Sequence, residues 1–353
     1  MKKALVPALA AFAALVLAAA IPAAAATADT RPASTRITDS WALARITQTG
    51  PVPAGQSSYS YTTQSQGEGV NAYIIDSGID ISHPDFEGRA SVEYDPFGNG
   101  PNDCTGHGTG LAENLGGRTY GVAKKVNLLA VHTQPCGGGG TNQDFINAIN
   151  WVAAHHKSPA VAVFAHNWNG FGYYGLMNEV SVAINNLAQS GVFVAVSAGN
   201  PTDAGWLFPA ANQRYAVENP PANASQALVV MGTAPDDTVP LGLVPNPGCN
   251  NYKAWSAVGG DIYAPGFPVK TIKEVPNAHN SPFVNDCGTS YAAPMAAGVG
   301  ALYKATYGDA PSATVKSWIT AHATQGAVTN NPPQDGGNTN TFTPNLLLNT
   351  GGL

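Results

Sequence analysis

The sequence predicts an α/β protein in which a central, mostly parallel β-sheet is flanked by helices. The first observation is a series of short, mostly apolar runs, each of strand length, at residues 70–75, 126–131, 160–164, 192–196 and 227–231. The second is that segments with apolar residues at helical spacing alternate with these runs. Strands that are apolar throughout are typical of parallel sheets covered on both faces.

Residues 1–28 have the pattern of a secretory signal peptide and are not expected to be part of the folded domain. A basic head at Met1 to Lys3 precedes an apolar run at 4–21, and Ala24 to Ala28 offers two overlapping A-x-A cleavage patterns. An uncleaved membrane anchor is the alternative, because the apolar run is nearly long enough to span a bilayer. We expect cleavage, a secreted protein and no membrane contact afterwards.

The remaining chain, about 325 residues, is long enough for one large domain or two small ones. No linker divides it, so we expect a short segment at 29–40 followed by a single domain at 41–353, and a monomer. A net charge of −6 argues against a nucleic-acid partner, whose phosphates need a basic surface. Four cysteines in an exported chain favour disulfides, for which three pairings exist.

The other elements are predicted from local pattern. Residues 29–68, rich in Ser, Thr, Pro and Gln, predict an extended arm with turns. A first helix is indicated by the apolar residues Phe145, Ile146, Ile149, Trp151 and Val152. A second is indicated by Val180, Val182, Ile184 and Leu187. Residues 329–340, rich in Asn, Pro and Gly, predict a surface loop.

Three polar residues stand where chemistry could occur. Asp76 follows the strand predicted at 70–75, and functional groups collect at the carboxyl ends of parallel strands. His107 lies in Gly106-His107-Gly108, where the glycines leave its imidazole uncovered. Ser290 precedes an apolar helix, whose N-terminal N–H groups can stabilise an oxyanion. Each residue alone has a commoner structural explanation: a strand cap, a packed histidine and a helix cap.

Together the three motifs stand in the order Asp, His, Ser, which is that of subtilisin. An α/β-hydrolase would need Ser first, in G-x-S-x-G, and here Ala292 occupies the last place. The chain resembles the subtilase family, in its proteinase K and aqualysin branch, from Trp41 almost to its C-terminus. The motifs that carry the resemblance are Gly106 to Gly110, Gly288 to Pro294, Ser82 to Arg89, Tyr120 to Lys125, Ala198-Gly199-Asn200 and Ala264-Pro265-Gly266.

The resemblance implies a three-layer subtilisin-like fold and a catalytic triad. Ser290 would be the nucleophile, His107 the general base and then acid, and Asp76 the residue that orients the imidazole. Asn200 would bind the oxyanion together with the Ser290 N–H, whereas a simple turn former at this position would matter little. The chemistry requires no cofactor.

The same resemblance assigns the substrate-binding residues and the disulfides. Gly138, Gly139 and Gly140, which by composition could be a flexible linker, would form a sheet edge for an extended polypeptide substrate. Ala165, His166 and Asn167 would form the opposite wall. Cys104 would pair with Cys136, as in aqualysin, which leaves Cys249 for Cys287.

Several positions depart from the family pattern. Too few residues separate the cleavage pattern from Trp41 for a folded propeptide. The wall that normally reads Ser-Leu-Gly-Gly aligns with Ala165-His166-Asn167-Trp168, which adds bulk and would narrow or redirect the primary pocket.

Two further departures concern single residues. Glu113 replaces a small helix residue, so it must either find a partner or point into the cleft, with His132 and His166 as the nearest candidates. Asp261 matches one carboxylate of a family calcium site, and a structural calcium is left open.

Three functions stay in competition. The leading one is a serine endopeptidase that works through an acyl-enzyme. The second keeps the triad but acts on esters or a restricted set of peptides, because the wall has changed. The third is a binding protein that keeps the subtilase fold but does not turn over substrate. The presence of all three triad residues and Asn200 disfavours it.

Overall fold

The fold is described by a computed structural model, which covers residues 32–53, 55–138, 140–166, 174–200, 216, 221–240, 249, 256–331 and 343–353, without the side chains of 174–177. The predicted signal peptide, Gly139, Asn167 and Trp168 lie outside these described residues, as do most of the predicted loop at 329–340.

Helices and strands follow one another along the chain. The helices are α1 (Trp41–Arg45), η1 (Pro84–Phe86, a 3₁₀ turn), α2 (His107–Gly116), α3 (Asn142–His155), α4 (Tyr174–Gln189), α5 (Thr289–Tyr307) and α6 (Ser312–His322). The strands are β1 (Ser34–Thr38), β2 (Tyr59–Thr63), β3 (Asn71–Asp76), β4 (Ala90–Tyr94), β5 (Asn127–His132), β6 (Ala160–Phe164), β7 (Phe193–Ser197), β8 (Leu228–Thr233), β9 (Ile262–Pro265), β10 (Val269–Ile272), β11 (Phe283–Asp286), β12 (Thr324–Gln325) and β13 (Leu346–Leu347).

The main sheet of the described part of the chain has nine strands in the order β12-β13-β9-β8-β7-β6-β3-β5-β4. Every neighbouring pair is parallel except β12 and β13. This confirms the predicted α/β class with a mostly parallel sheet, and all five predicted strand segments lie within one or two residues of observed strands. The short antiparallel pairs β1–β2 and β10–β11 stand apart from this sheet.

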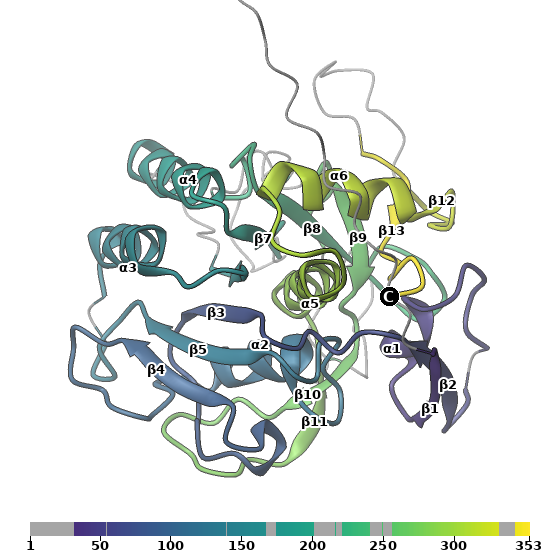
Figure 1. The fold of residues 1–353 in the computed structure, drawn as a ribbon, viewed down its shortest axis with the longest axis horizontal. Helices are drawn as coiled ribbons and strands as arrows, with labels where there is room; N and C mark the ends of the chain where they lie inside the picture. Colours follow the sequence, from purple (N-terminus) through teal and green to yellow (C-terminus); the bar gives the residue numbers. More distant parts are fainter. Residues whose placement is uncertain are drawn as a thin grey trace, which may run out of the picture.

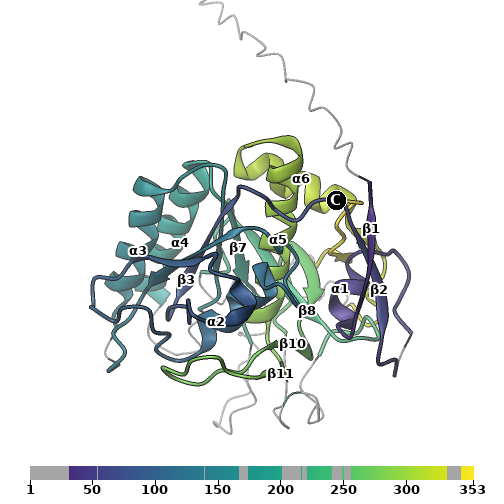
Figure 2. The same ribbon diagram turned by 60° about the horizontal axis from the view of Figure 1, so that its bottom comes forward.

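Helices cover both faces of the sheet (Figure 1). Successive residues of a strand point to opposite faces, so Ala72 and Ile74 enter one core while Tyr73 and Ile75 enter another. The first core contains α2, α5 and α6, and the second contains α3 and α4. In the turned view α3 and α4 lie together, separated from α5 and α6 (Figure 2). Helices, sheet and helices thus form the three expected layers.

One local prediction was wrong. The predicted extended arm contains the helix α1, whose five residues are all buried, between the paired strands β1 and β2. In α4, Val182, one of the apolar residues that indicated this helix, is 57% exposed, while the neighbouring Ser181 and Ala183 are buried. The arm packs on the main core because Leu43 and Ile46 bury their side chains there.

Candidate active site

The topology brings polar residues from several strands to one edge of the sheet. Strand β3 lies between β5 and β6, and Asp76 at its end is level with His132, while the preceding Ile75 is level with Phe164. Strands β5 and β4 lie on one side of β3, and β6 and β7 lie on the other. Such a change of direction in the strand order opens a crevice at the carboxyl ends of the strands. Ala165 and Asn200 follow β6 and β7 into the same region.

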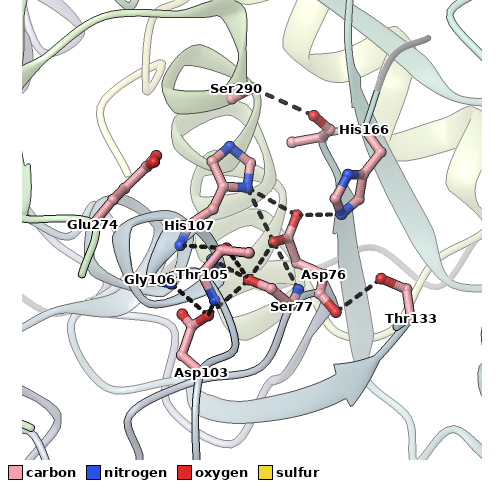
Figure 3. A network of polar contacts seen from close by, with 12 residues as sticks. Asp76, Ser77, Asp103, Thr105, Gly106, His107, Thr133, His166, Glu274 and Ser290 are labelled. Carbon is pink, nitrogen blue, oxygen red and sulfur yellow. Dashed lines mark hydrogen bonds and ion pairs between the residues drawn. The ribbon is translucent and has the colours of Figure 1, made fainter. Parts of the chain in front are cut away.

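The Asp76 carboxylate is fully buried and surrounded by donors (Figure 3). Its Oδ1 accepts hydrogen bonds from the Ser77 backbone N–H at 2.7 Å and the Ser77 hydroxyl at 3.0 Å. The Nδ1 of His107 lies 3.0 Å from Oδ1 and 3.1 Å from Oδ2. The Nε2 of His166 lies 3.1 Å from Oδ2. Burial alone would raise the pKa of Asp76, but the two imidazoles hold it well below its ordinary value.

His107 is the first residue of α2, and glycines allow it to stand there. Gly106, the N-cap, has φ +91°, and a Cβ at that residue would lie 2.3 Å from the Val275 nitrogen. A Cβ on Gly108 would lie 2.1 Å from the Gly78 carbonyl oxygen. Only glycine therefore permits this close approach of α2 to the end of β3, which places the imidazole against Asp76.

A buried carboxylate that the sequence analysis missed holds this turn. Asp103 accepts hydrogen bonds from the Gly106 N–H at 2.8 Å, the Thr109 N–H at 2.7 Å and the Ser77 hydroxyl at 2.7 Å. It therefore joins the start of α2 to the residue after Asp76. The available signal was an Asp just before a helix that begins at His107, where a carboxylate is the preferred partner of unpaired N–H groups.

Ser290 is the second residue of α5 and is 8% exposed. Its hydroxyl donates to the Ala165 carbonyl oxygen at 3.3 Å. The His107 ring lies between Asp76 and Ser290 in Figure 3, so its Nε2 is directed toward the serine while Nδ1 faces the carboxylate.

Two hydrogen-bond donors converge beside Ser290. The Asn200 side-chain oxygen accepts from the Thr289 N–H at 2.8 Å and the Thr289 hydroxyl at 2.9 Å, which orients the amide. A Cβ built on Gly288 would lie 3.3 Å from Asn200 Nδ2 and 3.6 Å from the Ser290 nitrogen. Both N–H donors therefore border the same small space, which the missing side chain of Gly288 leaves open. Thr289 is a second residue that the sequence analysis did not single out.

The predicted substrate-binding residues differ from one another in where they lie and in what they contact. Gly138 is exposed, has φ +82° and donates its N–H to Pro135, so it lies in a turn. Gly140 ends this turn beside Gln134. Ala165 lies at the site through its carbonyl contact with Ser290, but the His166 side chain contacts Asp76. Gly139 and Asn167 lie outside the described residues.

Both expected disulfides are present. Cys104 is joined to Cys136, and Cys249 is joined to Cys287. The first bond links the segment before His107 to the segment before the glycine run. The second attaches Cys249 to the residue that precedes Gly288.

Glu113 finds a partner, but not one of the predicted histidines. It is fully buried, and its Oε1 accepts the Tyr120 backbone N–H at 2.9 Å. Burial, and then the neighbouring Asp85 carboxylate, raise the pKa of Glu113 well above its ordinary value. A carboxyl that stays protonated avoids the cost of a buried charge, so proximity to His132 or His166 is not required.

Asp261 is bound by a cation of the chain itself. Its Oδ2 accepts from the Val229 N–H and the Lys316 ammonium, each at 2.8 Å. The same ammonium donates to the carbonyls of Ala227 at 2.7 Å and Ser225 at 3.4 Å. With Lys316 among these oxygens, the residues do not fit a calcium ion at Asp261. Among the residues that the structure describes, no group of three or more His, Cys, Asp or Glu side chains is arranged for a metal.

Comparison with known proteins agrees with this geometry. Residues 67–342 match the model of the Subtilase family. An extracellular serine proteinase from Thermus sp. (strain Rt41A) is 33% identical over 88% of this chain and 66% of its own length. Alkaline serine exoprotease A from Vibrio alginolyticus is 31% identical over 82% of this chain and 48% of its own. The chain therefore spans about half to two thirds of the length of these relatives.

A solved structure shares the fold. The crystal structure of a cold-adapted subtilisin-like serine proteinase superposes with a TM-score of 0.69 at 28% identity, over 88% of this chain and 97% of that one. The family match covers most of the residues from Trp41 onward, including Asp76, His107 and Ser290. The chain belongs to the Subtilase family.

Proposed function

We propose that this protein is a serine endopeptidase that hydrolyses polypeptides through an acyl-enzyme. The observation that carries the proposal is the line of side chains from the buried Asp76 carboxylate through His107 to Ser290. A carboxylate on Nδ1 keeps a proton on that nitrogen, which leaves Nε2 as the basic atom facing the serine hydroxyl. The relatives named as an extracellular serine proteinase and an alkaline serine exoprotease support serine-type hydrolysis of peptides.

In the proposed reaction Ser290 Oγ attacks the carbonyl carbon of the scissile peptide bond while its proton passes to His107 Nε2. Asp76 stabilises the resulting imidazolium. The carbonyl oxygen becomes an oxyanion in the space between Asn200 Nδ2 and the Ser290 N–H. His107 then gives its proton to the leaving amine. In the second half a water is deprotonated by His107 and cleaves the acyl-serine ester, which restores the hydroxyl.

The substrate would bind as an extended strand between the turn at Gly138 and Gly140 and the end of β6 at Ala165. Gly138 leaves the space around its Cα open, since a Cβ there would meet nothing within 4 Å. A peptide backbone can approach such a residue closely. Subtilases need no cofactor for this chemistry, and the substrate is the only partner that the proposal requires.

We also propose secretion. The predicted signal peptide at 1–28 and the Thermus relative named as extracellular both support it. The two disulfides are typical of an oxidising compartment. No helix in the described part of the chain is long and apolar enough to cross a membrane.

One experiment separates the three candidate functions. Purified protein and its Ser290→Ala variant are treated with a fluorophosphonate probe and, separately, with casein. Labelling and casein cleavage by the wild type alone support the endopeptidase. Labelling without casein cleavage would favour an ester or restricted peptide substrate, and equal absence of labelling in both proteins would contradict any triad chemistry.

Replacing Asn200 with alanine is expected to lower kcat by about 10²–10³-fold, the size of the loss that such a change causes in subtilisin, with little change in KM. The reason is that its Nδ2 donor acts on the oxyanion, which exists only in the transition state. Initial rates on a peptide anilide measure both constants. An equal rise in KM with unchanged kcat would instead assign Asn200 to ground-state substrate binding.

The pH dependence of kcat/KM follows from the charges around His107. Burial would lower the pKa of His107, but the Asp76 carboxylate, together with Glu274 and Asp103, raises it well above the ordinary value of 6.5. The protonated imidazole cannot accept the Ser290 proton, so activity is low below this pKa and rises as the pH increases through it. We expect the acid limb of the kcat/KM profile to lie above pH 6.5. A limb at or below that value would contradict the proposed environment.

A further inference from the structure

Two imidazoles, rather than one, contact the buried carboxylate of Asp76. Oδ1 accepts hydrogen bonds from the Ser77 N–H and hydroxyl and also contacts His107 Nδ1. Among the described residues, Oδ2 is contacted by His107 Nδ1 and by His166 Nε2, each at 3.1 Å. His107 therefore contacts both carboxylate oxygens, whereas His166 contacts Oδ2. Figure 3 shows the two rings approaching Asp76 from different sides.

Strand pairing explains how His166 reaches this position. Strands β3 and β6 are parallel neighbours with Ile75 level with Phe164, so the residues just beyond them, Asp76 and Ala165, are side by side. His166 is the next residue and its side chain returns toward the end of β3. Its ring centroid lies 5.1 Å from that of Phe145, 5.8 Å from that of Phe164 and 5.9 Å from that of His107. The imidazole is thus held between the α3 side of the sheet and the catalytic histidine.

A histidine is not needed to fill this space. The subtilase pattern at this position is leucine, which would pack against the same phenylalanines without touching the carboxylate through a polar atom. The change from leucine to histidine places a hydrogen-bond donor where the family pattern has a methyl group. The His166 side chain is 22% exposed, and its Nε2 lies within ion-pair distance of Asp76 Oδ2, at 3.1 Å. A buried polar group is costly unless it has such a partner.

We propose that His166 is a positioning residue that holds Asp76 through Oδ2 and lowers the basicity of His107. With a proton on Nε2, His166 donates to the carboxylate and takes part of its negative charge. Less of that charge then stabilises the His107 imidazolium, so the His107 base form persists to lower pH than it would with leucine at position 166.

The other charged groups near the pair do not replace His166. Asp103 and Glu274 act on His107 from the loop before α2 and from the segment after β10, and both raise its pKa. His132, on the far side of β3, contacts Asn99 through Nδ1, and burial lowers its pKa. His166 is therefore the donor, among the described charged and titratable neighbours, that opposes the effect of Asp76 on His107.

The test compares His166→Leu with His166→Gln. Leucine removes the donor, and glutamine keeps an N–H at similar reach but cannot titrate. We expect His166→Leu to raise the His107 pKa by about 0.5–1 unit and to lower kcat about fivefold, the effect of one lost hydrogen bond on a catalytic group. His166→Gln should restore kcat to within about twofold of the wild type, by the same reasoning. His322→Leu, the same replacement at an exposed histidine on α6, is the control and should change neither quantity.

The His107 pKa is measured twice, by NMR titration of ¹³Cε1-labelled histidine and from the acid limb of kcat/KM. The kinetic arm rests on the proposed function, but the NMR arm does not. Lack of turnover in the wild type would contradict the endopeptidase and leave the NMR test decisive for His166. An unchanged His107 pKa in His166→Leu, with thermal unfolding like that of the wild type, would overturn the proposal, as would a glutamine variant that behaves like the leucine one.

Discussion

Replacement of Ser290 by alanine is expected to lower kcat by about 10⁶-fold, as removal of the nucleophile does in subtilisin. The hydroxyl is the only atom of Ser290 that would form the acyl-enzyme, while its backbone N–H would still border the oxyanion space in the variant. KM should therefore change little, and fluorophosphonate labelling should disappear. A stopped-flow assay with an activated ester should show a burst in the wild type and none in the variant.

The structure indicates that replacing Ser290 by alanine removes the hydroxyl while leaving the start of α5 in place. Within the described part of the chain, the Ser290 hydroxyl donates a hydrogen bond to the Ala165 carbonyl, and alanine keeps the Cβ in the start of α5. Loss of activity with an unchanged far-UV spectrum and unfolding temperature would assign the effect to chemistry. Residual activity within about 100-fold of the wild type would contradict the assignment of Ser290 as nucleophile, since triad members rarely cost so little.

Replacement of Asp76 by asparagine is expected to lower kcat by about 10⁴-fold at neutral pH. The carboxylate accepts hydrogen bonds from His107 and Ser77, and His166 Nε2 lies 3.1 Å from its Oδ2. An amide has one accepting oxygen and one donating nitrogen, so at least one of the imidazoles must change its tautomer or lose its contact. If His107 moves its proton to Nε2, it can no longer accept the proton of Ser290.

The same variant changes the pH dependence. Asp76 is the largest of the charged contributions that raise the His107 pKa, so its removal should return that pKa toward or below the ordinary value of 6.5. The acid limb of kcat/KM should therefore move to lower pH although the plateau is far lower. A profile of unchanged position with a lower plateau would show that Asp76 acts on orientation alone. Measurement of kcat/KM from pH 4 to 10 distinguishes the two.

Much of the fold could be predicted because its signals are local. The five apolar runs are continuous since parallel strands are buried on both faces, and each run lies at an observed strand. The short helix α1 gave no comparable signal. Its five residues are too few to show a helical period, and it is helical because Ser40 caps it and the core buries it. The exposed Val182 shows the same limit, as a valine in a helix does not by itself indicate which face is buried.

The residues of the candidate site also divide into those that the sequence predicted and those that were found in the structure. Asp76, His107, Ser290 and Asn200 were predicted from motifs whose glycines and strand ends are written in consecutive residues. Thr289 was missed because its contact with Asn200, 89 residues away in the chain, is visible only in the fold. Asp103 was missed although its place just before the start of α2 was a local signal. The partner of Glu113 was predicted wrongly, since its hydrogen bond with the Tyr120 N–H and the Asp85 carboxylate that raises its pKa leave no pattern in the sequence.

The sequence by itself determined the alternation of strands and helices, the identity of the polar groups and the family resemblance, since each depends on residues close together in the chain. Only the tertiary structure decided that His166 meets Asp76 and that Lys316 meets Asp261. Both outcomes depend on which strands and helices are neighbours and on the direction in which a side chain leaves its backbone. A single sequence specifies these only through the packing of the whole sheet.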